Sequence, residues 1–472
     1  MDQILYWNAV ALESDRIAHT DIAAAERGSR GPVGSSRALA IVHLAMHDAY
    51  FSIFGAAHGT WLTEPPVAAN GSAVESAVAV AAHTTLTALY PAQHARLDRA
   101  LREAGLRGPG TGRGGAHGQA VGRAVLKARA GDPSLFDGDY LSDIVPPNHR
   151  PDPVNPKQGY YAPHYGARSR CFAVSRRYTL DAPPKRSDPR YLAALRDVRA
   201  KGITLESAAA GPPRSAARTP DETLIAVFWA YDGARQIGTP PRFYNQIART
   251  LAAARENTVE QNARLFALVN TALADAGILC WDEKYRHNLW RPILGIREYD
   301  PAIGPEAVPG HDLDPDCDPF WQPHGAPRSN ETAVNFTPPF PSYPSGHAAF
   351  GGAAFQMLRR CYGAVGAGPD SLTDGTGFIS DELDGVSTDN RGVVRARHVR
   401  MFLDGLWQMM QENARSRVFL GVHWAFDAYA TDARGMMDLS QNIGGVRLGR
   451  DVADNLWTGG LKQDRAAGPR LP

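Results

Sequence analysis

The chain has 472 residues and an almost balanced charge, with 50 lysine and arginine residues against 49 aspartate and glutamate residues. Because no strong basic excess is present, neither nucleic acid nor an anionic membrane is expected as a partner. The amino-terminal segment mixes acidic and basic residues and lacks the uninterrupted apolar centre of a secretory signal, and no apolar run approaches the roughly 18 residues that cross a bilayer. These features predict a soluble protein that is cytoplasmic by default, with export by another route left open.

The spacing of the cysteines indicates neither a metal site nor a disulfide framework. The four cysteines are widely separated and include no Cys-x-x-Cys pair, so free thiols in a reducing compartment are expected. They are Cys171, Cys280, Cys317 and Cys361. Length alone permits two or three domains, since a chain of this size builds a large core.

Helical periodicity dominates the chain, whereas the alternating patterns of strands are scarce. An all-α fold is therefore predicted. The expected helices cover residues 36–54, 73–90, 118–129, 222–234, 258–276, 348–362, 399–412 and 422–436.

Long irregular segments separate the predicted helices. Loops of this length often control access to a functional site, and the one that leads into Ser345 is expected to roof the entrance of such a site. The segments are residues 105–118, which are rich in glycine, residues 132–184, which are expected to wrap the surface, residues 300–343 and residues 363–397.

The first chemically informative motif pairs two cations. Lys284 and Arg291 lie seven positions apart. On one continuous helix this spacing returns both side chains to nearly the same face, roughly 10 Å apart along the axis. Two long cationic side chains would then reach a single anion.

A predicted helix start forms the second motif, Pro344-Ser-Gly-His347. Pro344 suits the first turn of a helix, which places the next three residues at its amide-rich end. Free N–H groups at a helix start favour an anion. Gly346 has no Cβ and lets an oxyanion approach the backbone, and the Ser345 hydroxyl can donate one more hydrogen bond.

The third motif is Ser416-Arg417, followed by His423 and Asp427. Arg417 adds a third cation with a planar set of donors. Each motif alone is ordinary, because paired cations usually form a solvated helix face and a serine often caps a helix. Together, three cations and an amide-rich helix start indicate a ligand with two or three negative charges, such as phosphate or vanadate.

The order and spacing of the three motifs, Lys-x6-Arg-Pro, Pro-Ser-Gly-His and Ser-Arg-x5-His-x3-Asp, resemble the signature shared by vanadium-dependent haloperoxidases and the type 2 phosphatidic acid phosphatase superfamily. The chain is also similar to vanadium chloroperoxidases in patches outside the motifs. These patches include residues 4–8, 37–48, 228–233, 238–247 and 276–281. The long inserts between the motifs look more like those of the peroxidases than those of the small phosphatases.

The resemblance implies an all-α fold of two packed four-helix bundles with long irregular loops, the site lying in the second bundle. It divides the chain into a helical half of residues 1–215, a site-bearing half of residues 216–450 and a tail of residues 451–472. The two halves are expected to form one compact unit. Assembly into a homo-oligomer stays open.

The resemblance also implies a vanadate cofactor bound covalently to His423, with phosphate competing for the same site. A neutral imidazole is the form that ligates. Asp427 would either orient that ring or cap and pair nearby, and His347 would move protons as a general acid and base. Asp232 aligns with a family carboxylate that pairs with Arg417, although a solvated carboxylate is the competing interpretation. The residues implied to hold the vanadate oxygens are Lys284, Arg291, Ser345, Gly346 and Arg417.

The implied activity is the oxidation of a halide by hydrogen peroxide to hypohalous acid, which then reacts with an organic halogen acceptor. Lys284 would donate to the peroxide and make it more electrophilic. Phe340 and Trp281 match the chloroperoxidase pattern, and two aromatic walls would exclude water and strengthen that donor. Chloride oxidation is therefore predicted beside bromide oxidation, the alternative being that both aromatic residues are ordinary core.

Two other functions fit the same motifs. In a soluble acid phosphatase of the same superfamily, His423 would attack phosphorus to form a phosphohistidine, and His347 would protonate the leaving oxygen. In a non-catalytic phosphate-binding or scaffold protein, neither histidine would be needed. Replacement of either histidine therefore separates the catalytic hypotheses from the third.

Three further patterns are weaker. His43 and His47 lie on one helical face but lack a third metal ligand, so packed histidines are expected. The glycine-rich run that begins at Gly108 is not followed by the Gly-Lys-Ser/Thr of a phosphate loop. The alternating aspartates of residues 312–318 lack the glycine and glutamate of a calcium loop, which favours an acidic surface turn.

Overall fold

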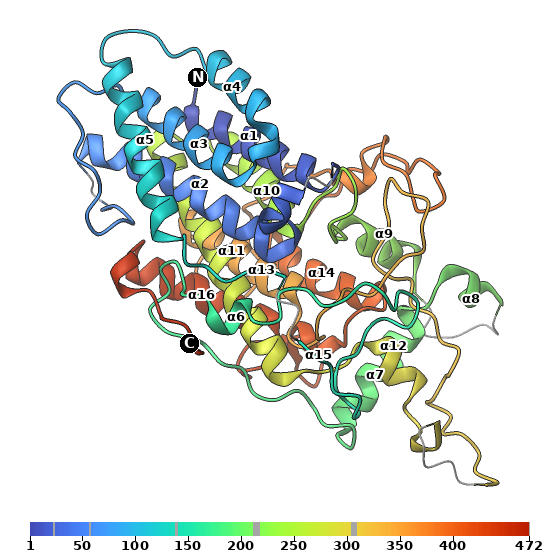
Figure 1. Cartoon of the computed structure of the whole chain (residues 1–472). Helices are drawn as coiled ribbons and strands as arrows, with labels where there is room; N and C mark the ends of the chain where they lie inside the picture. Colours follow the sequence, from blue (N-terminus) through green and yellow to red (C-terminus); the bar gives the residue numbers. More distant parts are fainter. Residues whose placement is uncertain (22–23, 56–57, 137–139, 211–217, 304–308, 472) are drawn as a thin grey trace.

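The computed structural model describes residues 1–21, 24–55, 58–136, 140–210, 218–303 and 309–471. Within these ranges the protein is α-helical with one short antiparallel hairpin, so the predicted all-α class is confirmed. The longer helices form two packed groups, and long loops extend at the right of Figure 1. The expected boundary between residues 215 and 216 lies outside the described residues.

The first group of helices, at the upper left of Figure 1, comprises α1 (Gln3–Ala18), α2 (Gly31–Phe54), α3 (Val74–Leu89), α4 (His94–Glu103) and α5 (Thr111–Ala128), with the 3-10 turns η1 (Ala24–Ser29) and η2 (Pro91–Gln93). α2, α3 and α5 pack against one another. The contact between α3 and α5 is close because glycine lines it: a Cβ on Gly118 would stand 2.1 Å from the Ala77 carbonyl oxygen.

The second group comprises α11 (Val259–His287), α13 (Gly346–Cys361), α14 (Gly405–Phe419) and α16 (Gly445–Gly459). α13 packs against the other three helices. Glycine again permits the closest contact, since a Cβ on Gly449 would stand 2.1 Å from the Ala349 carbonyl oxygen. α11 also packs along α2 and so joins the two groups into one core.

Shorter elements and long loops complete the described chain. They are α6 (Tyr165–Arg168), α7 (Pro189–Lys201), α8 (Leu205–Ala210), α9 (Pro220–Phe228), α10 (Pro240–Ala254), α12 (Pro292–Arg297), α15 (Ala425–Ala428) and the 3-10 turns η3 (Pro301–Ile303), η4 (Asp381–Leu383) and η5 (Gln463–Arg465). The hairpin joins β1 (Ala430–Thr431) to β2 (Met437–Asp438), with Ala430 opposite Asp438.

α11 is the central helix of the molecule. A capping box of Thr258 and Gln261 begins it, and Asn288 ends it in a left-handed conformation with φ of 49°. Its length and composition alone would allow it to cross a membrane, contrary to the expectation that no segment approaches that length. However, 94% of its most apolar window is buried in the protein. A helix that is apolar on all sides and covered by others is a core helix.

Several predicted elements differ from the structure. The helix predicted over residues 222–234 ends at Phe228, and the one predicted over residues 258–276 continues to His287. The helix predicted over residues 422–436 is wrong: the single turn of α15 leads into the hairpin, because the Asp432 carboxylate accepts from the N–H groups of Arg434 and Met436, each at 2.9 Å. The helix predicted over residues 399–412 begins later, at Gly405. The glycine-rich segment of residues 105–118 is irregular only in its first half, since α5 begins at Thr111 and uses its glycines for packing.

α1, α4, α7, α10 and α16 are helices that the sequence analysis does not predict. α10 and α16 carry an apolar face that packs on the core, so the periodic signal is present in their sequences. α1 has a weaker pattern, and its start is stabilised by the Asp2 carboxylate, which accepts from the N–H groups of Ile4 at 2.8 Å and Leu5 at 3.1 Å.

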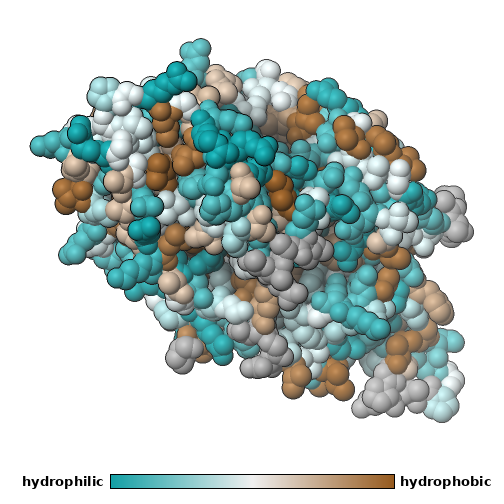
Figure 2. Space-filling view, turned by 45° about the horizontal axis from the view of Figure 1, so that its top comes forward, coloured by the Kyte–Doolittle hydropathy of each residue, from teal (hydrophilic) through white to brown (hydrophobic). Residues whose placement is uncertain are grey.

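Other sequence expectations concern the core and the surface. The four cysteines are free thiols, as predicted. His43 and His47 are buried and hydrogen-bonded, with His43 Nδ1 at 2.7 Å from the Leu39 carbonyl oxygen and His47 Nδ1 at 2.9 Å from the Asp48 carboxylate. The face shown in Figure 2 is largely hydrophilic, with apolar residues in small separate groups.

Candidate active site

The three motifs meet in the second helix group, where each predicted cation is buried. Lys284 is 0% exposed, and Arg291 and Arg417 are each 1% exposed. Lys284 lies in the last turn of α11, Arg291 caps the start of α12, and Arg417 lies in the last turn of α14. Three separate elements therefore supply the positive charge.

The expected continuous helix from Lys284 to Arg291 is wrong. Asn288, directly after α11, adopts the left-handed conformation and turns the chain. Both side chains instead reach the loop before α13. The Arg291 Nε donates to the Phe340 carbonyl oxygen, and the Lys284 Nζ donates to the Pro341 carbonyl oxygen, each at 2.9 Å. The two cations are thus brought together by a tight turn and a shared loop.

Lys284 is held by backbone carbonyl groups. Its Nζ donates to the oxygens of Pro341 at 2.9 Å, Ser342 at 3.0 Å and Pro344. Burial lowers the pKa of Lys284 to about 7. Burial therefore opposes the positive charge of this lysine, one of the three cations that the motifs predict.

One nitrogen of the Arg291 guanidinium group, Nη2, is available to donate to a ligand. Its Nη1 donates to the Val422 carbonyl oxygen at 2.8 Å and lies 2.9 Å from His423 Nε2. Its Nη2 is buried and has no hydrogen-bond partner within the described ranges. A buried guanidinium N–H without an acceptor is costly. This atom is therefore a donor suited to an oxyanion.

Arg417 pairs with Asp232, the carboxylate that the resemblance implies. Its Nη2 lies 2.6 Å from Asp232 Oδ1. Its Nε is buried and has no hydrogen-bond partner in the part of the chain that the structure describes. Burial raises the pKa of Asp232, against the opposing effect of Arg417. The pair reduces the excess positive charge and still leaves one N–H group of the guanidinium unused.

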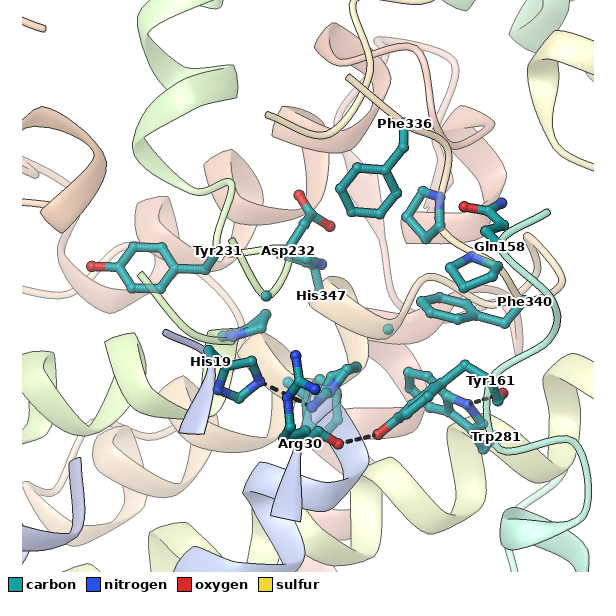
Figure 3. A pocket seen from close by; sticks show the side chains of 18 of the residues that line it. His19, Arg30, Gln158, Tyr161, Tyr231, Asp232, Trp281, Phe336, Phe340 and His347 are labelled. Carbon is teal, nitrogen blue, oxygen red and sulfur yellow. Dashed lines mark hydrogen bonds between the residues drawn. The ribbon is translucent and has the colours of Figure 1, made fainter. Parts of the chain in front are cut away.

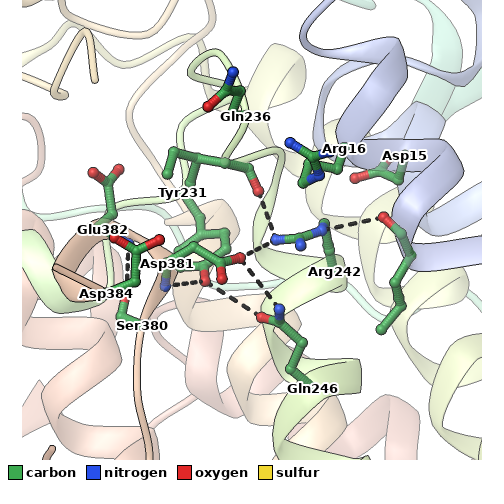
Figure 4. A network of polar contacts seen from close by, with 12 residues as sticks. Asp15, Arg16, Tyr231, Gln236, Arg242, Gln246, Ser380, Asp381, Glu382 and Asp384 are labelled. Atoms are coloured by element: carbon green, nitrogen blue, oxygen red, sulfur yellow. Dashed lines mark hydrogen bonds and ion pairs between the residues drawn. The ribbon is translucent and has the colours of Figure 1, made fainter. Parts of the chain in front are cut away.

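A polar network fixes the turn that carries Asp232 (Figure 4). Tyr231 has a φ of 44°, which is strained for an aromatic residue. Its hydroxyl accepts from the Asp381 N–H at 2.9 Å and donates to Gln246 Oε1 at 3.3 Å. Arg242 of α10 also pairs with the Asp381 carboxylate. These contacts join α10 to η4 around the turn.

His423 lies just before α15, and its two ring nitrogens have different surroundings. Nδ1 lies 2.8 Å from Asp427 Oδ2, an oxygen that also accepts from the Ser342 hydroxyl and from the Trp424 N–H at 3.1 Å. Nε2 faces Arg291 at 2.9 Å. A carboxylate beside Nδ1 favours the tautomer with its proton there and a lone pair on Nε2. Burial and the nearby cations lower the pKa of His423 well below its ordinary value, so the imidazole is neutral.

The start of α13 contacts the backbone of the same residue, Asp427. Ser345 is the N-cap, so Pro344 precedes the cap instead of lying in the first turn as expected. The Ser345 N–H donates to the Asp427 carbonyl oxygen at 2.8 Å. Its hydroxyl oxygen accepts from the Ala348 N–H at 3.4 Å, which leaves the hydroxyl proton free to donate to a ligand.

Gly346 and His347 follow in the first turn of α13. A Cβ on Gly346 would stand 3.2 Å from Trp281 Cζ3, tighter than ordinary packing. His347 Nε2 lies 2.6 Å from the Ala230 carbonyl oxygen, and since a carbonyl only accepts, Nε2 carries the proton and Nδ1 the lone pair. The His347 carbonyl accepts from the Asn413 amide at 2.8 Å. Burial lowers the pKa of His347 well below its ordinary value.

A cavity of about 320 Å³ opens beside these residues (Figure 3). His347, Arg417 and His423 line it, whereas Lys284 and Arg291 are not part of its surface. Aromatic and proline side chains supply much of the remaining wall, including Phe136, Tyr161, Trp281, Phe336, Pro338 and Phe340.

Trp281 and Phe340 form an aromatic wall next to the cations. Their ring centroids are 4.9 Å apart. The Lys284 Nζ lies 5.6 Å from the Trp281 centroid and 5.2 Å from the Phe340 centroid, and the Arg291 guanidinium lies 5.0 Å from the latter. Both rings therefore contact the cavity on one side and the buried charges on the other.

Motif reasoning misses several residues of the site. Gln158 and Tyr161 belong to the segment expected only to wrap the surface, yet both line the cavity. Tyr161 is anchored there by its hydroxyl, which donates to the Arg30 carbonyl oxygen at 2.8 Å. Ser342 and Asn413 hold the Asp427 carboxylate and the start of α13. A buried asparagine three residues before Ser416 is a weak sequence signal, and the two cavity residues carry none.

An all-α fold with a buried, cation-rich pocket at a helix start, flanked by two neutral imidazoles, defines a class of oxyanion-binding proteins. Two family descriptions match the chain: the vanadium chloroperoxidase N-terminal domain over residues 1–102 and the second helical-bundle domain of vanadium chloroperoxidase over residues 264–458. The vanadium chloroperoxidase of Curvularia inaequalis is 36% identical over an alignment that covers 97% of this chain and 90% of that protein. The chain therefore belongs to the vanadium-dependent haloperoxidase family.

Solved structures share the fold. A bacterial vanadium-dependent iodoperoxidase superposes with a TM-score of 0.64 at 21% identity, covering 98% of this chain and 97% of that chain. The holo form of a bacterial vanadium-dependent chloroperoxidase superposes with a TM-score of 0.62 at 15% identity, covering 92% of this chain and 93% of that chain. The architecture is thus common to relatives named for different halides.

Proposed function

We propose that this protein is a vanadate-dependent enzyme that oxidises bromide and chloride with hydrogen peroxide to hypohalous acid. The observation that carries the proposal is the Asp427 carboxylate at Nδ1 of His423, beside guanidinium N–H groups of Arg291 and Arg417 that have no partner among the described residues. A ligand that fits both features accepts several hydrogen bonds and also bonds to an imidazole nitrogen. Vanadate does both, and it is the cofactor for which the family is named.

The residues present fit this group. His423 Nε2 would bind it, and Arg291, Arg417, the Ser345 hydroxyl and the Gly346 N–H would hold its oxygens. When bound, vanadate supplies a Lewis acid that activates hydrogen peroxide. For His423 to bind, the Arg291 Nη1 must leave Nε2, and its change of partner from imidazole to oxyanion keeps the guanidinium satisfied.

Two residues of the chain would handle protons and charge during turnover. His347 would accept a proton at Nδ1 and return it, a step for which its neutral state at working pH is the required starting form. Lys284 would exchange one carbonyl acceptor for an oxygen of peroxide, placing positive charge where negative charge is released. Such preorganised donors act strongly in a site from which water is excluded.

Halide choice is proposed to depend on Phe340 and Trp281. Chloride is harder to oxidise than bromide and requires a more electrophilic peroxide. The two rings lie within 5.6 Å of the Lys284 Nζ and keep water from it, which strengthens the charge of that donor. A polar residue in the place of Phe340 would hydrate the lysine and weaken it.

Halide rates measured with and without vanadate test the proposal. Metal-free wild-type protein should be inactive with a phenolic dye until vanadate is added, and excess phosphate should prevent reconstitution because both anions use the same donors. Phe340→His should lose chloride activity more than bromide activity. Full halogenation without vanadate, or phosphate ester hydrolysis as the only activity, would overturn the peroxidase assignment and favour the phosphatase.

A further inference from the structure

The cavity is larger and more apolar than halide and peroxide require. Its volume of about 320 Å³ falls at the lower end of the ~300–1,000 Å³ range of small-molecule sites. Beyond the wall of Trp281 and Phe340, the cavity is lined by the rings of Phe136, Tyr161 and Phe336, and the labelled side chains in Figure 3 surround a common space. Halide and peroxide are small and hydrophilic, so they do not account for a wall of this chemistry.

Two arginines outside the oxyanion pocket, Arg30 and Arg328, line the cavity, and Arg328 is the one that stacks on an aromatic ring of its wall. Arg328 lines the cavity and is half-buried, and its guanidinium carbon lies 4.2 Å from the centroid of Phe336. Among the described residues, its side chain forms no hydrogen bond or ion pair. By contrast, Arg417, which also faces the cavity, is paired with Asp232. Arg328 therefore presents unused planar donors beside an aromatic surface.

A planar guanidinium stacked on a ring recognises a carboxylate next to an aromatic group. Arginine matches the two oxygens of a carboxylate with parallel N–H donors. Stacking on Phe336 restricts the side chain in advance, so less entropy is lost when the ion pair forms. If Arg328 binds the carboxylate of a ligand, the rest of that ligand lies among the aromatic rings of the cavity. His347 and His423 line the same cavity.

We propose, on the basis of the proposed function, that the organic halogen acceptor binds in this cavity and is an electron-rich arene of one or two rings that carries a carboxylate. Its carboxylate pairs with Arg328, and its ring packs between Phe336 and Tyr161. In the halogenation step the halogen of hypohalous acid forms a bond to a ring carbon, that carbon loses its proton, and the hydroxide and proton leave as water. The bound orientation then determines which ring carbon reacts.

Binding can be measured without turnover by saturating the oxyanion pocket with inorganic phosphate. The ligand pair is 3-(3-hydroxyphenyl)propanoate, whose ring has three inequivalent activated positions, and its methyl ester, which is uncharged and carries one extra methyl group. Calorimetry on wild type should show the acid binding at least about tenfold more tightly, as expected for a charge-assisted bidentate pair. Arg328→Gln should remove this preference. Arg123→Gln, on an exposed position of α5, is the matched control and should keep it.

The vanadate-loaded enzyme gives a second readout. With bromide and peroxide, the ratio of brominated isomers of the acid should differ from the ratio that hypobromous acid produces in buffer, and Arg328→Gln should restore the buffer ratio.

Equal binding of acid and ester, or identical isomer ratios, would overturn the proposal even if halide oxidation is normal. Tight, Arg328-dependent binding of the acid in a protein that oxidises no halide would instead contradict the proposed function and leave the acid site standing. The comparison of acid and ester on wild type remains informative even if Arg328→Gln fails to fold.

Discussion

The carboxylate of Asp427 is expected to determine which nitrogen of His423 is available to a ligand. It lies 2.8 Å from Nδ1 and also accepts from Ser342 and Trp424. Asp427→Asn keeps the shape but removes the charge and introduces N–H donors, so the ring loses its fixed tautomer. We expect vanadate affinity to fall about 10- to 100-fold, as for other residues that orient a metal-binding histidine.

Equilibrium binding of vanadate to Asp427→Asn and His423→Ala checks this prediction. The alanine variant removes the proposed ligating atom and should lose nearly all turnover, so it marks the maximum effect. If the asparagine variant binds vanadate as wild type does, Asp427 is a structural partner of Ser342 and does not position the ring.

Lys284 should make anion binding depend on pH. Burial lowers the pKa of Lys284 to about 7. A lysine with a lowered pKa contributes to the stability of the ligand-free fold at pH values above its ordinary pKa. This contribution is lost as the pH falls through about 7. A bound anion compensates the charge and raises the pKa again. Phosphate binding should therefore take up a proton, and affinity should decline as pH rises above about 7.

Calorimetric titration of phosphate in two buffers of different ionisation enthalpy counts this proton. Lys284→Gln is the control, because the titration of phosphate itself is common to both proteins and cancels in the comparison. Wild type should take up more protons than the variant at and above neutral pH. Equal uptake by the two proteins would show that Lys284 stays charged in the ligand-free state.

At the scale of the helices, α16 holds the start of α13 in place. A Cβ on Gly445 would stand 2.3 Å from the Ser345 carbonyl oxygen and 2.8 Å from the Ala349 nitrogen. Gly445→Ala must therefore displace the helix start that carries Ser345 and Gly346, the groups proposed to bind the anion. We expect a loss of about 1–3 kcal/mol in the free energy of unfolding, as for overpacking elsewhere, together with weaker phosphate binding.

Gly118→Ala provides the matched control for this prediction. Its Cβ would stand 2.1 Å from the Ala77 carbonyl oxygen in the contact between α5 and α3, far in the fold from α13. This variant should lose comparable stability but bind phosphate normally. Denaturant unfolding measures the stability of both variants, and calorimetry measures their phosphate affinity. Equal losses of phosphate affinity in the two variants would mean that Gly445 affects binding through global stability alone.

At the scale of the whole molecule, the two helix groups should fold as one unit. α11 packs on α2 of the first group and on α13 of the second, and Gly31 of α2 lines the cavity together with His347 of α13. We therefore propose that the halves of residues 1–215 and 216–450 are not independent domains. Separating them would expose the apolar surface of α11 to water.

Scanning calorimetry on the full chain tests whether the two helix groups unfold as one cooperative unit. A single unfolding transition is expected, and added vanadate should shift all of it upward, because a ligand that binds only the folded state stabilises the whole cooperative unit. Two transitions of which vanadate moves one would contradict the proposal. A fragment of residues 216–450 is expected neither to fold alone nor to bind vanadate.

The sequence alone was enough to predict the all-α class and to select residues that the fold brings together. Helices such as α2 and α13 have a periodic pattern of apolar residues, which by itself indicates a helix. The motif residues Lys284, Arg291, Ser345 and Arg417 are each of a type whose charge or hydrogen-bonding groups imply an anion, whatever path the chain takes between them. That is why these residues could be selected even though the helix assumed to join the first two cations is wrong.

Only the tertiary structure decided how those residues are arranged and what else surrounds them. Burial by segments far away in the sequence lowers the pKa values of His423 and Lys284 and leaves Arg291 Nη2 with no partner among the described residues. The cavity wall likewise comes from loops with no periodic signal, which bring Tyr161 and Arg328 to the site. Desolvation and long-range packing depend on the three-dimensional neighbours of a residue, and a local pattern does not contain them.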